Sequence, residues 1–147
     1  MPAYVGRVEA REVVERLGLA PHPEGGWYRE TWRGRPGADG RAVGTSILFL
    51  LAAERPSRWH RVDADEVWSW HAGDPLELSI SAAGDAVERG LLGIDLAAGE
   101  RPQLVVPAGA WQSARTLGEW TLVGCAVVPG FSPAGFELAP LGWRPGP

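Results

Sequence analysis

The sequence of 147 residues contains no lysine and no asparagine, and its only cysteine is Cys125. Without lysine the chain cannot form a Schiff base on one of its own side chains, which excludes pyridoxal-type enzymes that need one. Without asparagine it has no acceptor for N-glycosylation. A single cysteine excludes an intrachain disulfide and is compatible with a reducing compartment.

Segments that direct a chain to a membrane or to nucleic acid are also lacking. The first 19 residues contain no apolar stretch of the kind that a signal peptide requires. The longest uncharged apolar run, residues 42–53, is too short to span a bilayer. The net charge is −4 and no basic run occurs, which argues against nucleic acid as a partner. We therefore expect a cytoplasmic protein with no membrane or nucleic-acid partner.

The composition is that of a globular protein, with 45% hydrophobic and 22% charged residues. We expect one domain over residues 1–147, beginning with a short helix at residues 9–17 that Gly18 ends. Short apolar runs broken by Gly, Pro and Asp follow at intervals of about ten residues, which indicates an antiparallel β-sandwich or small barrel. The predicted strands are residues 26–33, 43–53, 59–62, 66–72, 76–82, 86–93, 103–106, 111–115, 121–128 and 136–138.

Two short stretches carry the residues with the clearest chemical potential. In the first, His60 and Glu66 are followed by Gly73, and the intervening residues 63–65 have the composition of a turn. If the flanking runs pair as a hairpin, His60 and Glu66 point to the same interior. In the second stretch, Pro107 and Gly109 turn the chain and Gln112 follows. We expect Gln112 to enter the same interior from a neighbouring strand.

This spacing resembles the two motifs of the cupin superfamily. His60, Glu66 and Gly73 match the first histidine, the glutamate and the closing glycine of the first motif, and Pro107 with Gly109 matches the turn of the second. The sequence departs from these motifs at several positions. Val62 and Gln112 stand where cupins have histidine, Glu54 replaces the opening glycine, and Thr116 replaces the closing asparagine. Seven residues rather than five separate Gly99 from Pro107.

A closer resemblance covers nearly the whole chain. The chain resembles the small cupin-5 (DUF985) family in the segments HPEGGWYRET (22–31), TSILFLL (45–51), WHRVDADEVWSWHAGDPLEL (59–78), VVPAGAWQSA (105–114) and VGCAVVPGFSPAGFEL (123–138). The resemblance implies an all-β fold, the cupin double-stranded β-helix or jelly-roll barrel, with a short N-terminal helix. It also implies a homodimer, because cupins of this size usually pair through sheet edges. The family is known more by its fold than by its chemistry.

A divalent metal ion is one cofactor that the residues suggest. Imidazole and carboxylate are good ligands for transition metals, whereas a neutral amide is a poor one. The candidate metal ligands are therefore His60, Glu66 and Gln112. With glutamine and valine at the two other histidine positions of the motif, a metal is optional, and His60 with Glu66 are the residues that we expect to be catalytic.

Residues 22–31 allow two interpretations. A Pro-Glu-Gly-Gly sequence is typical of an ordinary turn that leads into an edge strand. Alternatively, the segment brings His22, Tyr28 or Arg29 to the mouth of the barrel. Alternation along the strand places Tyr28 on one face and Arg29 on the other.

Tryptophan is abundant, with eight residues in the chain. Three of them flank the candidate polar residues: Trp68, Trp70 and Trp111. Aromatic walls with a few converging polar groups are typical of small-molecule pockets. These tryptophans predict a pocket for a small, partly apolar or sugar-like molecule.

Three functions remain open from the sequence. One is an isomerase or epimerase acting by proton abstraction beside a carbonyl, for which the resemblance to cupin epimerases implies His60 as base and Tyr28 as acid. Tyr4 is the only other tyrosine. In that mechanism Arg29 or Arg61 would hold anionic substrate groups. The second is a metal-dependent enzyme, and the third is a protein that binds a metabolite without turnover.

Overall fold

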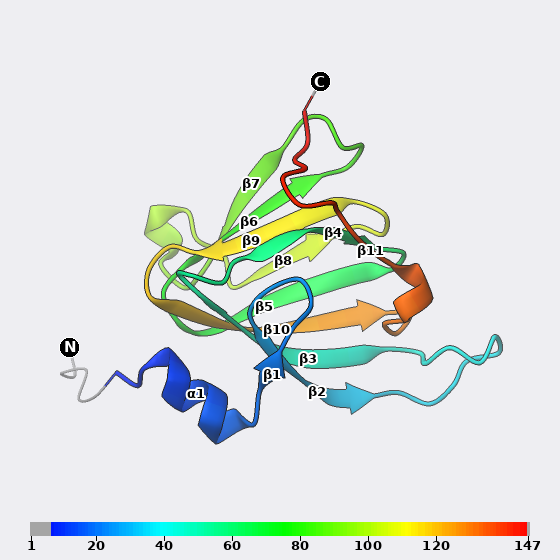
Figure 1. The fold of residues 1–147 in the computed structure, drawn as a ribbon, viewed down its shortest axis with the longest axis horizontal. Coiled ribbons are helices and arrows are strands. Elements are labelled where there is room, and N and C mark those ends of the chain that lie inside the picture. Colours follow the sequence, from blue (N-terminus) through cyan, green and yellow to red (C-terminus); the bar gives the residue numbers. More distant parts are fainter. Residues whose placement is uncertain (1–6, 147) are drawn as a thin grey trace.

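The computed structural model describes residues 7–146, so Tyr4 lies outside the described part of the chain. Two antiparallel sheets face each other in the jelly-roll arrangement that the cupin resemblance implies (Figure 1). One sheet has the order β1 (Ala20–Pro21), β2 (Trp27–Arg33), β3 (Thr45–Ala52), β10 (Trp120–Val128), β5 (Asp65–Gly73) and β8 (Gln103–Val106). The other has the order β11 (Phe136–Leu138), β4 (Ser57–Val62), β9 (Trp111–Thr116), β6 (Leu76–Ser81) and β7 (Glu88–Leu92).

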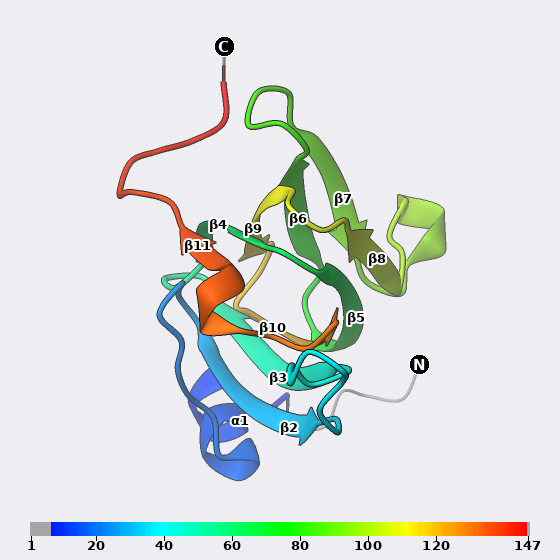
Figure 2. The same cartoon turned by 90° about the vertical axis from the view of Figure 1, so that its right-hand side faces the viewer.

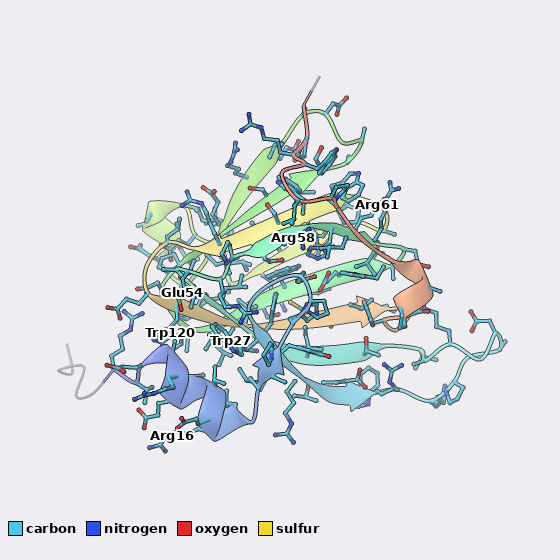
Figure 3. The ribbon with its side chains drawn as sticks, in the orientation of Figure 1. Arg16, Trp27, Glu54, Arg58, Arg61 and Trp120 are labelled. Atoms are coloured by element: carbon cyan, nitrogen blue, oxygen red, sulfur yellow. The ribbon has the colours of Figure 1, made fainter. Side chains whose placement is uncertain are left out.

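The helix α1 (Ala10–Leu17) forms where the apolar spacing predicts it. Gly18 ends it in the left-handed conformation, with φ of 66°, and its N–H bonds back to the carbonyl of Glu15. The buried side chain of Val13 packs on the outer face of the larger sheet against Leu50 and Trp120. Trp27 and Trp120 lie beside the helix in Figure 3. The helix therefore closes one face of the sheet and leaves the other face to the interior.

Strand β3 shows why residues 42–53 form an apolar run without alternation. Phe49 and Leu51 point between the two sheets and belong to the main core, whereas Leu50 and Ala52 point outward beneath α1. A strand that is covered on both faces needs apolar side chains on both. The end-on view in Figure 2 shows the two sheets as separate layers, with α1 outside the larger one.

The predicted hairpin between residues 59–62 and 66–72 does not form. Strand β4 pairs with β9 and β11 in one sheet, and β5 pairs with β10 and β8 in the other. The short link 63–64 carries the chain from one sheet to the other, so His60 and Glu66 approach each other across the gap between the layers. Gln112 enters as expected from a neighbouring strand, since it lies opposite His60 in the β4–β9 ladder.

Two 3₁₀ helices, η1 (Leu96–Ala98) and η2 (Pro133–Gly135), complete the described elements. Over residues 7–146, no helix has the length and apolar content that crossing a bilayer would require.

Candidate functional site

A cavity of about 400 Å³ lies between the two sheets. One part of its lining is apolar and aromatic, and it includes Ile47, Phe49, Val62, Val127, Phe131 and Phe136. The other part carries titratable groups. Glu30 and Arg33 lie at the exposed rim, and the buried or partly buried ones are His22, Glu24, Tyr28, His60, Glu66 and Cys125. Such a cavity, apolar with a few converging polar groups, is the usual form of a small-molecule site.

The shortest ion-pair distance between the buried groups of this lining joins His60 to Glu24. The Nε2 atom of His60 lies 3.1 Å from Oε2 of Glu24, and each of the two side chains is less than a tenth exposed. Ser57 donates its hydroxyl to the other carboxyl oxygen of Glu24 at 3.0 Å. The backbone N–H of Arg58 also donates to the carbonyl of Glu24, at 2.7 Å. Strand β4 thus holds both partners of the contact.

The hydrogen bonds of His60 fix its tautomer. Its Nδ1 atom lies 2.7 Å from the carbonyl oxygen of Arg58, and a carbonyl only accepts, so Nδ1 carries a proton. In a neutral imidazole Nε2 is then an acceptor, and the hydrogen bond to Glu24 requires the proton to sit on the carboxyl group. One proton therefore lies between Oε2 of Glu24 and Nε2 of His60, and we call these two residues the Glu24–His60 pair.

Burial favours this neutral form of the pair. It raises the pKa of Glu24 from 4.5 to about 8, although the hydrogen bond from Ser57 opposes the shift. Burial also lowers the pKa of His60, and the nearby Glu66 offsets only part of that effect. In a site that water does not reach, the pKa of a titratable group commonly shifts so that its neutral form is favoured. At neutral pH the proton of the pair therefore resides on Glu24.

Glu66 approaches from the opposite sheet and is held by a chain of hydrogen bonds. The indole N–H of Trp68 donates to Oε1 of Gln112 at 3.0 Å, and the amide NH₂ of Gln112 donates to Oε1 of Glu66 at 2.8 Å. Because the indole only donates, it fixes which end of the Gln112 amide faces Glu66. Burial raises the pKa of Glu66 to about 7, while His60 and the Gln112 amide oppose the rise.

These side chains do not fit a divalent metal ion as they are arranged. Both ring nitrogens of His60 are engaged, by Arg58 and Glu24, and the Gln112 oxygen already accepts from Trp68. Within residues 7–146 no three His, Cys, Asp or Glu side chains are grouped so that they could hold a metal ion. We therefore derive no chemical step through a metal.

His22, Tyr28 and Phe49 contribute packed rings to the cavity wall. The rings of His22 and Tyr28 pack edge to face with centroids 4.5 Å apart, and His22 also packs against Phe49. Burial, with His60 nearby, lowers the pKa of His22 to about 4, so its ring is neutral at physiological pH. His22 and Tyr28 thus line the cavity, as the second interpretation of residues 22–31 expects, whereas Arg29 does not.

The remaining candidate residues lie away from this cavity. Trp68 and Gln112 are buried and do not line the cavity. Gln112 contacts the lining residue Glu66 through its amide. Four others lie elsewhere: Arg29 donates to the carbonyl of Leu17, Trp70 donates to the carbonyl of Asp74, Arg61 pairs with Glu137, and Trp111 packs against Trp143. Figure 3 shows Arg61 on the outside, beside the C-terminal segment.

Sequence reasoning missed Glu24 as a site residue. It stands in a Pro-Glu-Gly-Gly turn, where a glutamate is ordinarily solvated, and its side chain is nevertheless only 7% exposed. Its position in residues 22–31 could have indicated a role for Glu24. The whole segment resembles the family, whereas the sequences of most turns vary freely.

Comparisons with known proteins agree with this fold. The family model for the cupin superfamily (DUF985) matches residues 11–139. A protein of Shewanella oneidensis with a crystal structure is 39% identical, with a TM-score of 0.87 over 90% of this chain and 85% of that one. A hypothetical protein from Leishmania major is 34% identical, with a TM-score of 0.84 over 92% and 90% of the two chains.

More distant structures share the fold alone. Oxalate decarboxylase of Bacillus subtilis is 18% identical, with a TM-score of 0.61, and the match covers 81% of this chain but 29% of that enzyme. No protein of curated function matches the chain. The family match and the two similar structures, which together span most of the sequence, show that the chain belongs to the cupin superfamily (DUF985) family.

Proposed function

We propose that the protein is an enzyme of the isomerase or epimerase type, which moves a proton on a small carbonyl compound bound in the cavity. The observation that carries this proposal is the 3.1 Å contact between His60 and Glu24 at a buried position of the cavity wall. A carboxyl group whose pKa is raised to about 8 is matched to proton transfer near neutral pH, where a general base must be regenerated in each cycle.

The Glu24–His60 pair is the base once it has lost its shared proton. A proton taken from the substrate carbon then returns to the position between Oε2 of Glu24 and Nε2 of His60, and the electron pair of the broken C–H bond moves onto the carbonyl as an enolate. Tyr28 lines the same cavity and has the hydroxyl that can donate to the enolate oxygen. For an α-hydroxy carbonyl substrate, Tyr28 gives its proton to the enolate oxygen and then takes the proton of the neighbouring hydroxyl, which becomes the new carbonyl. The pair returns its proton to the former carbonyl carbon, and this completes the isomerisation.

The test is exchange of substrate hydrogen with solvent. We expect one or more members of a panel of small aldoses, ketoses, hydroxy ketones and amino ketones to lose a C–H signal in D₂O when the protein is present, as measured by proton NMR. Exchange should fall at least about 100-fold in His60→Gln and in Glu24→Gln, because each removes one half of the base. The rate should rise with pH up to about 8, following the raised pKa of Glu24.

His71→Gln is the matched control, because His71 is exposed and does not line the cavity. Circular dichroism and thermal unfolding establish that each variant is folded before its exchange rate is compared. The proposal is wrong if no compound of the panel exchanges above the rate in buffer, or if folded His60→Gln exchanges as fast as the parent protein.

The apolar lining favours a second candidate, a protein that holds a metabolite without turnover. Six of the lining residues named above are aliphatic or phenylalanine, and burial of apolar surface alone supplies binding energy. A panel member that quenches tryptophan fluorescence or shows saturation-transfer NMR signals, yet never exchanges hydrogen, would favour this function over the enzyme.

A further inference from the structure

The charge of the cavity limits what it can bind. Among the described lining residues, Arg33 alone carries a permanent positive charge. Its guanidinium is engaged with the carboxylate of Glu30 through two hydrogen bonds of 2.9 Å each, at the exposed rim. No side chain of the described lining is thus free to balance a phosphate or a carboxylate of a ligand.

Two acidic groups lie deeper in the same cavity. Glu24 and Glu66 are 5% and 7% exposed, and neither has an arginine partner. An anionic ligand would have to lose its water beside these carboxyl groups, which costs several kcal/mol without a compensating cation. A cationic ligand would instead provide a positive charge that stabilises the ionised form of these carboxyl groups.

Three phenylalanine side chains of the cavity lining suit the apolar part of such a ligand. They are Phe49, Phe131 and Phe136, and we call them the phenylalanine wall. The rings of Phe131 and Phe136 pack with centroids 5.7 Å apart, and Phe136 also lies 5.7 Å from the ring of His60. The faces of aromatic rings attract organic cations as well as apolar surface.

We propose that the cavity takes small organic ammonium compounds, whose charged nitrogen is balanced by Glu24 and Glu66 and whose apolar part lies against the phenylalanine wall. The inference rests on the proposed function in taking this cavity as the substrate site. It replaces the earlier expectation of an anionic substrate held by Arg29 or Arg61, since those two side chains lie outside the cavity.

Cation binding also connects the ligand to the chemistry. A positive charge beside the carboxyl groups lowers their pKa values, so the shared proton of the Glu24–His60 pair leaves for solvent. The remaining groups that line the cavity beside this proton are His22, Tyr28, Glu66 and Cys125. Burial raises the pKa of Glu66 to about 7, so Glu66 also releases part of its proton. The bound ammonium compound thus generates the base form of the pair at neutral pH.

Three compounds of similar shape test the charge preference: benzylammonium, benzyl alcohol and benzoate. We expect calorimetry at pH 7 to show benzylammonium binding at least about tenfold more tightly than benzyl alcohol, with no benzoate binding. The heat of benzylammonium binding should differ between phosphate and Tris buffers by the amount that release of about one proton or more per ligand produces.

Variants separate the acidic groups from the rest of the cavity. Glu66→Gln should weaken benzylammonium binding about tenfold and leave benzyl alcohol unchanged, whereas Glu88→Gln on the exposed strand β7 should change neither. The inference is overturned if benzyl alcohol or benzoate binds as tightly as benzylammonium, or if benzylammonium fails to bind at about 10 mM. It is also overturned if binding releases no proton.

The two proposals fail in different ways. Hydrogen exchange on neutral compounds together with preferential binding of benzyl alcohol would contradict the ammonium ligand and leave the enzyme intact. Preferential and proton-releasing binding of benzylammonium, with no hydrogen exchange on amino ketones or on the neutral panel, would contradict the enzyme and leave the ligand class intact.

Discussion

The free energy of unfolding is expected to fall by about 2 kcal/mol as the pH rises from about 6.5 to about 8.5. The folded protein holds protons on two buried carboxyl groups, because the pKa of Glu24 is raised to about 8 and that of Glu66 to about 7. The unfolded chain has already lost both protons above pH 4.5. Since the folded state binds more protons than the unfolded state in this range, a rising pH favours unfolding.

The two buried histidines give the opposite slope on the acid side. Burial lowers the pKa of His22 to about 4 and also lowers that of His60. Between about pH 6.5 and pH 4 the histidines therefore bind protons in the unfolded chain but not in the folded protein. Down to about pH 4.5 this proton uptake balances the protons that the two glutamates hold only in the folded protein, so the free energy of unfolding changes little there. Stability from this cluster should be greatest between about pH 4.5 and pH 6.5 and should decline on both sides.

Urea unfolding across this pH range measures the effect. In the double variant Glu24→Gln, Glu66→Gln the alkaline decline should disappear, because glutamine has the shape of glutamic acid but does not titrate. Glu88→Gln should keep the slope of the parent protein, since Glu88 is exposed. A parent protein whose stability is flat or rises between pH 6.5 and pH 8.5 would show that the buried carboxyl groups are ionised in the folded state.

Replacing Gly25 with alanine is expected to destabilise the protein by at least about 3 kcal/mol and to abolish hydrogen exchange. Gly25 has φ of 115°, and a Cβ atom there would overlap the carbonyl oxygen of Pro56. The turn is also closed by a hydrogen bond of 3.0 Å from the Gly25 N–H to the carbonyl of His22. Relief of the overlap must move the turn away from β4, and Glu24 moves with it.

Gly40→Ala is the matched control for this substitution. Gly40 also has a positive φ, of 83°, but no atom lies within 4 Å of the position that a Cβ would occupy. Its replacement should cost only the conformational strain, about 1 kcal/mol, and should leave exchange intact. Equal melting temperatures for the two variants would contradict the close packing of the turn against β4.

Much of the fold followed from the sequence because local patterns and tertiary packing agree there. The apolar spacing and Gly18 located α1, and short apolar runs broken by glycine and proline located the longer strands. The pairing of β4 and β5 was not predictable in this way. A short link between two strands is as compatible with a change of sheet as with a hairpin, and only the other strands decide between them.

The candidate site shows a different limit. Trp111 and Gln112 are adjacent on β9, and Arg61 is adjacent to His60 on β4, so the alternation of a strand places each pair on opposite faces. That rule alone separates the inward Gln112 and His60 from the outward Trp111 and Arg61. No such rule could predict that Glu24 is buried, because the burial of a turn depends on which strand it packs against.

The central claim is that the Glu24–His60 pair is neutral and holds one proton. Nitrogen NMR of histidine tests this claim most directly. With ¹⁵N-labelled histidine the spectrum contains signals from only three residues, and His60→Gln identifies those of His60. At pH 7 we predict that Nδ1 of His60 carries a proton and that Nε2 does not. A His60 ring protonated on Nε2 alone, or on both nitrogens, would contradict the account.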